Sequence, residues 1–110
     1  MKSAPKPPKA YRLFVETYPK LGRAWELSSE AGQDGPLDEK TIRLIKMAVA
    51  IGALREGALH SSVRKALAAG VSKEELEQVV ALAAGTLGFP ATVAVFCWVQ
   101  DVLDKPIGKK

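Results

Sequence analysis

The feature that most constrains the fold is a series of helix start and stop signals between residues 38 and 103. Asp38 is a good N-cap for one helix. Gly70 suits the residue that follows a helix end, and Ser72 opens the capping-box pattern of the next helix. Pro90 fits the first turn of a last helix. These signals predict four consecutive helices.

The spacing of apolar residues supports helices throughout the chain. No long alternating pattern with hairpin turns is present, although the β-branched residues of 91–103 are also compatible with a strand. Two shorter helices are expected at 10–18 and from Pro19 onward. We predict that Leu13, Phe14 and Tyr18 of the first helix face inward. The second helix carries Leu21, Trp25 and Leu27, and Trp25 is expected to be a core or interface residue. The sequence therefore predicts an all-α bundle of about six helices.

Composition indicates one helical domain at 10–104, with a disordered or arm-like tail at 1–9 and a basic tail at 105–110. Six lysines lie in these tails, and residues 10–104 hold 10 basic against 12 acidic residues, so the net charge of +4 is a property of the tails. We therefore do not expect nucleic-acid binding. The N-terminus has no apolar signal segment and no apolar run is long enough for a bilayer, so we expect a cytoplasmic protein without a membrane partner.

Three of the predicted helices are apolar around most of their circumference, which is more than 110 residues can bury alone. Burying one large apolar side chain contributes roughly 1.5–3 kcal/mol. The simplest partner is another copy of the chain, in a symmetric homo-oligomer.

Cys97 is the single cysteine and His60 the single histidine. One cysteine excludes an intrachain disulfide and any CxxC motif. One histidine and one cysteine are too few for a typical zinc site, so we expect no metal and no cofactor. Because Cys97 lies between Phe96 and Trp98 on an apolar helix, we expect a buried thiol.

Three segments, 37–50, 66–76 and 88–91, resemble parts of the carboxymuconolactone decarboxylase family, which includes the alkylhydroperoxidase D-like proteins. They look like the first core helix, the helix-turn-helix and the lead into the final helix of that family, in that order. The resemblance covers about residues 37–103. It implies an alkylhydroperoxidase D-like helical bundle that assembles as a trimer or hexamer.

The peroxidase branch of the family uses a glutamate, a CxxC pair and a histidine. The resemblance places these positions on Arg43, on Arg55 and Ala58, and on Ser62, so all four residues are replaced. Without two thiols there is no disulfide to cycle, which excludes the CxxC peroxidase mechanism. The active site of this branch is degenerate here.

The lactone decarboxylase branch needs no cysteine. It has an arginine at the position of Arg55, which matches, and a histidine at the position of Ser62, which does not. Such a decarboxylation requires a cation that binds the carboxylate and an acid that protonates the resulting carbanion or enolate. By resemblance Arg55 supplies the cation, but Ser62 is a poor proton donor.

His60 has neighbours of its own. Glu56, His60 and Arg64 are spaced i, i+4 and i+8, which places them on one helix face. We predict His60 and Glu56 as catalytic residues, with Arg55, Arg64 and Ser62 binding a small anionic substrate. The alternative is that His60 is a hydrogen-bonding or interface histidine and the charges a solvated or intersubunit ion pair. The chain would then be a non-catalytic scaffold or ligand-binding protein.

Overall fold

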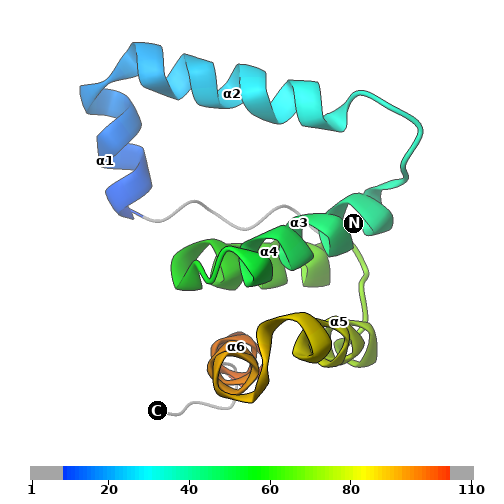
Figure 1. Cartoon of the computed structure of the whole chain (residues 1–110). Coiled ribbons are helices and arrows are strands. Elements are labelled where there is room, and N and C mark those ends of the chain that lie inside the picture. The colour runs from blue at the N-terminus through cyan, green and yellow to red at the C-terminus, as the bar shows by residue number, and fades with distance from the viewer. Residues whose placement is uncertain (1–8, 105–110) are drawn as a thin grey trace. The chain divides into compact units, whose positions relative to one another are not determined.

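The computed structural model describes residues 9–104 and contains six helices (Figure 1). They are α1 (Lys9–Thr17), α2 (Pro19–Gln33), α3 (Glu39–Gly52), α4 (Glu56–Ala68), α5 (Lys73–Leu87) and α6 (Phe89–Leu103). No strand is found in the described part of the chain, so the all-α prediction is confirmed. Residues 1–8 and 105–110, which hold most of the predicted tails, lie outside the described residues, while Lys9 is the first residue of α1.

The helices form two compact units, one with α1 and α2 and the other with α3 to α6. The predicted domain at 10–104 spans both units. No helix within residues 9–104 combines the length and the apolar character that crossing a membrane requires.

The helix boundaries of the second unit follow the start signals in the sequence. The Asp38 side chain accepts a hydrogen bond from the Thr41 backbone N–H at 2.9 Å, which caps α3. At the start of α5, the Ser72 N–H donates to the Glu75 carboxylate at 2.8 Å and the Glu75 N–H donates to the Ser72 hydroxyl at 3.0 Å. The predicted capping box is therefore present.

Hydrogen bonds at these helix starts also lower the pKa of two carboxyls. The pKa of Asp38 falls below its ordinary value of 3.8, mainly through its hydrogen bonds with Thr41. The pKa of Glu75 falls below 4.5, mainly through its hydrogen bond with the Ser72 backbone and with a smaller effect of Lys40. The ionised form of each carboxyl therefore stabilises the helix start that it caps.

The stop signal at Gly70 is also confirmed. Gly70 has a φ of +95°, in the left-handed region that glycine occupies without a steric penalty. The chain turns there and enters α5 only three residues later, which returns α5 to the rest of the unit.

In the second unit α3 and α4 form one layer and α5 and α6 the other (Figure 1). Within each layer the helices contact each other, and α4 packs on α6 while α3 packs on α5. The core lies between the layers. Its largest fully buried side chains are Met47, Ile51, Leu59, Val63, Leu76, Val95 and Val99.

The first unit has almost no core. Gly22 is its only buried residue in the described range. Val15 packs so closely against it that a Cβ on Gly22 would lie only 3.0 Å from the Cβ of Val15. Tyr11 and Trp25 meet edge to face at a centroid distance of 6.4 Å. Large apolar side chains of this unit are exposed because two helices offer no enclosed volume, so the prediction that Leu13, Phe14 and Tyr18 point inward is wrong. The exposed ones include Leu13, Phe14, Tyr18, Leu21, Trp25 and Leu27.

Candidate functional site

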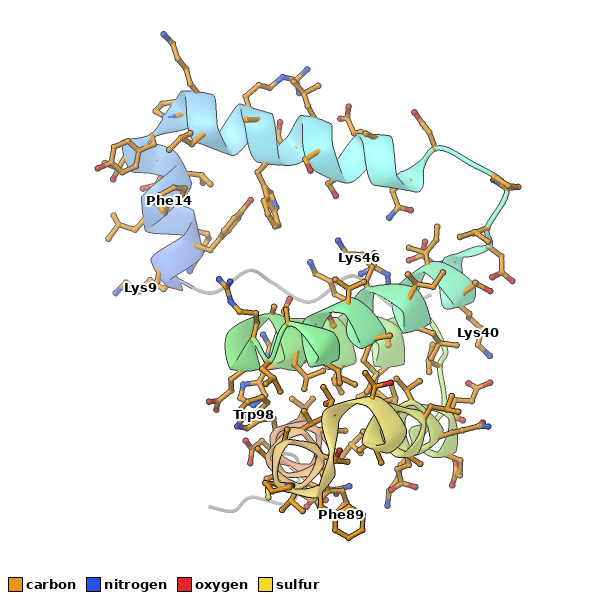
Figure 2. The ribbon with its side chains drawn as sticks, viewed as in Figure 1. Lys9, Phe14, Lys40, Lys46, Phe89 and Trp98 are labelled. Carbon is orange, nitrogen blue, oxygen red and sulfur yellow. The ribbon has the colours of Figure 1, made fainter. Side chains whose placement is uncertain are left out.

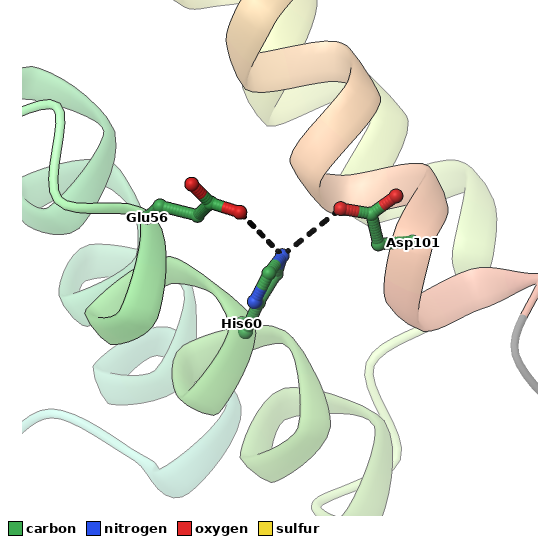
Figure 3. Close-up of side chains that lie close together, drawn as sticks. All are labelled: Glu56, His60 and Asp101. Carbon is green, nitrogen blue, oxygen red and sulfur yellow. Dashed lines mark hydrogen bonds and ion pairs between the residues drawn. The ribbon is translucent and has the colours of Figure 1, made fainter.

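His60 is held at the contact between α4 and α6. The preceding residue, Leu59, is fully buried and anchors this turn of α4 in the core. On α6 the fully buried Val99 fixes the last turns in the same way. As a result the Nε2 atom of His60 lies 3.2 Å from Oδ2 of Asp101, a hydrogen bond between two helices (Figure 3).

Glu56 approaches the same ring nitrogen from one turn earlier on α4. Its Oε2 lies 3.9 Å from His60 Nε2, as the i, i+4 spacing predicts (Figure 3). Nε2 carries at most one hydrogen, so Asp101 accepts it at the shorter distance while Glu56 adds negative charge beside it. This assigns the hydrogen to Nε2 and leaves Nδ1 as the nitrogen that neither carboxylate engages.

The His60 side chain is 25% exposed, whereas those of Glu56 and Asp101 are 54% and 57% exposed. The imidazole is thus oriented by packing and still open to a solute. The donor atoms of the three residues lie within 4.8 Å of one another, so they could also hold a divalent cation. Asp101 was not predicted, because 41 residues separate it from His60 and no motif marks it.

The other predicted site residues do not join this group. Arg55 is exposed immediately before α4, and Ser62 and Arg64 are half-buried. Within residues 9–104 no hydrogen bond or ion pair links them to His60. Ser62 lies about 200° around the helix from His60, which accounts for its separation.

A separate group of cations lies between α3 and α4. Arg43 is the only buried charged residue in the described range, and its Nε lies 3.3 Å from Glu39 Oε2 without the geometry of a hydrogen bond. Although the Lys65 side chain is largely exposed, partial desolvation lowers its pKa, and the positive charges of Arg43, Lys46 and Arg64 lower it further. The electrostatic potential that these neighbours produce at Lys65 is therefore positive.

An apolar groove of about 330 Å³ lies between α3 and α5. It is lined by side chains such as Leu44, Ile51, Val79 and Leu87, with Thr41 as its polar residue. None of the residues around it can exchange a proton near neutral pH, so this groove is not where His60 would act.

Cys97 is exposed, so the prediction of a buried thiol is wrong. Val95 and Val99, two residues to either side, are fully buried, and a two-residue step reverses the face of a helix. The apolar sequence of α6 concealed which of its faces meets the core.

The comparison with known protein families agrees with this fold. The model of the carboxymuconolactone decarboxylase family matches residues 19–101, which is most of the chain and includes every residue of the His60 group. Neither a curated protein nor a solved structure gives a significant match. On the extent of the family match, this chain belongs to the carboxymuconolactone decarboxylase family.

Proposed function

We propose that this protein acts by acid/base chemistry on a small anionic substrate, a carboxylate or a carboxylated lactone, with His60 transferring the proton. The observation that carries this proposal is the 3.2 Å hydrogen bond from His60 Nε2 to Asp101. A carboxylate behind an imidazole orients the ring and fixes which nitrogen carries the hydrogen. The family match supports decarboxylase-like chemistry in general.

In the proposed reaction the bond between the substrate carbon and its carboxylate breaks. Carbon dioxide leaves, the electron pair remains on the carbon as an enolate, and a proton from His60 Nδ1 is transferred to that carbon. Asp101 and Glu56 keep Nε2 protonated and hold the ring in place. Arg55 and Arg64 bind the carboxylate or lactone oxygens, whereas Ser62, about 200° around α4 from His60, lies too far around the helix to contact the same substrate.

The experiment is a measurement of carbon dioxide release from a panel of small carboxylated lactones. General acid catalysis contributes about 10²–10⁴-fold, so His60→Ala should lower kcat/KM by at least about 100-fold. Asp101→Ala should lower it less, because the imidazole remains. Asp104→Asn is the matched control, since it removes a carboxylate three residues further along and leaves the His60 group intact.

The assay is repeated after dialysis against EDTA. Equal rates with and without EDTA support proton transfer by His60, and loss of activity that zinc restores would instead assign Glu56, His60 and Asp101 to a metal. Turnover that survives His60→Ala at the wild-type rate would contradict the proposal.

A second candidate function is a non-catalytic homo-oligomeric scaffold, a trimer or hexamer, on the same fold. It is supported by the exposed apolar side chains of α5 and α6, among which Phe89 is 81% exposed. The others are Leu82, Val93 and Phe96. Light scattering should then give a multiple of the chain mass that Phe89→Ser lowers and Lys73→Ser does not, and a monomer for the unaltered chain would rule this candidate out.

A further inference from the structure

Three cations between α3 and α4, Arg43, Lys46 and Lys65, have no role in the proposed function. The two helices run side by side in opposite directions, joined by three residues (Figure 1). Arg43 lies nine residues before the end of α3, and Lys65 lies nine residues after the start of α4. Both therefore stand about 13 Å from the connection, at the same level of the helix pair. Lys46 is one turn from Arg43 and projects from α3 on the side away from α5 (Figure 2).

Within the α3–α6 unit, carboxylates do not balance this charge. Arg43 pairs with Glu39 at 3.3 Å, but the Glu39 side chain is 58% exposed. In the described range Lys46 and Lys65 have no ion pair, unlike Lys40 and Lys73, which pair with Glu75 and Glu77. Residues 1–8 and 105–110 contain no acidic side chain that could compensate.

Arg43 is the strongest indication of a ligand. Its side chain is only 10% exposed, yet its buried Nε has no hydrogen-bond partner within residues 9–104. A buried, charged donor without a partner is costly, and guanidinium groups are satisfied best by oxyanions that accept two hydrogen bonds. An oxyanion would contact the exposed 10% of the Arg43 side chain and would relieve the repulsion among the neighbouring cations.

We propose that Arg43, Lys46 and Lys65 form a binding site for a small, multiply charged oxyanion. The lowered pKa of Lys65 agrees with this site, because partial desolvation lowers it most and the nearby positive charges of Arg43, Lys46 and Arg64 lower it further. Lys65 lies about 140° around α4 from His60, so the site is separate from the proposed proton-transfer group. It is a binding site beyond the proposed function and does not depend on catalysis.

The test is saturable binding of citrate and of inorganic phosphate, measured by ¹⁵N NMR shifts of α3 and α4 amides and by Tm, with sodium chloride at matched ionic strength as reference. A bound anion stabilises the folded state in proportion to its occupancy, so Tm should rise by about 4 °C or more at saturation. Saturation by citrate alone assigns the site to carboxylates, saturation by phosphate alone assigns it to phosphates, and saturation by both assigns it to multiply charged oxyanions in general.

Lys46→Gln and Lys65→Gln should each weaken the apparent affinity roughly tenfold. Both residues are exposed, so these variants test the site even if Arg43→Met fails to fold. Lys40→Gln and Lys73→Gln remove lysines that already have carboxylate partners and should keep the full response. His60→Ala should also keep it, which separates this site from the proposed function.

Two results would overturn the proposal. The first is a Tm rise that grows linearly with citrate or phosphate and never saturates, as general exclusion of such salts from protein surfaces produces. The second is an affinity that Lys46→Gln and Lys65→Gln leave unchanged.

Discussion

The hydrogen bond between His60 and Asp101 joins helices α4 and α6, and a double-mutant cycle measures it directly. The perturbations are His60→Ala, Asp101→Ala and the double variant. The Nε2–Oδ2 distance of 3.2 Å is at the long end of the hydrogen-bond range, and the side chains are 25% and 57% exposed. Solvent screens such a pair, so we expect a coupling free energy of about 0.5–1 kcal/mol.

Urea unfolding at fixed protein concentration gives the four free energies of the cycle. With a slope of about 1 kcal/mol per molar urea, the coupling corresponds to roughly 0.5–1 M in the unfolding midpoint. The Glu56–His60 cycle should give less, about 0.3–0.5 kcal/mol, because the atoms are 3.9 Å apart on one helix. A His60–Asp101 coupling within error of zero, or one equal to that of an Asp104–His60 control cycle, would refute the geometry on which the proposed function rests.

Three further predictions concern stability. Leu59→Ala removes a fully buried core side chain and should cost about 2.7–5 kcal/mol, measured by calorimetry, whereas a cost under about 1 kcal/mol would contradict its core position. Asp38 and Glu75 have lowered pKa values in the folded protein, so their ionised forms stabilise the fold fully above pH 3.8 and 4.5, the ordinary values. This stabilisation is lost as pH falls through the lowered folded values. Asp38→Asn and Glu75→Gln should therefore flatten the decrease of the unfolding free energy at acid pH. The pKa of Lys65 is also lowered in the folded protein, so the unfolded chain binds the Lys65 proton more tightly. The free energy of unfolding should therefore rise with pH between that lowered value and 10.5. Urea denaturation across alkaline pH should show that Lys65→Gln abolishes this rise in stability.

The helices and their boundaries could be predicted from the sequence because their causes are local. Asp38 and Ser72 cap the N–H groups of the next turn, and the positive φ of Gly70 is accessible without strain. The i, i+4 proximity of Glu56 and His60 belongs to the same class, since it follows from helix geometry alone. Such features need no knowledge of which helices pack together.

Features that depend on packing could not be predicted. The apolar residues of α6 cover most of its circumference, so their pattern did not reveal that Cys97 faces away from the core. The same ambiguity made Leu13 and Trp25 look like core residues, although α1 and α2 alone enclose no volume.

The sequence by itself therefore determined the six helices, the fold class and the Glu56–His60 pair. The tertiary structure alone brought Asp101 to His60 across 41 residues and placed Arg43 and Lys65 at one level of the α3–α4 pair. The physical reason is that backbone hydrogen bonds and caps act within a few residues. Contacts between helices instead depend on which apolar faces pack together, and that choice is made by the whole core at once.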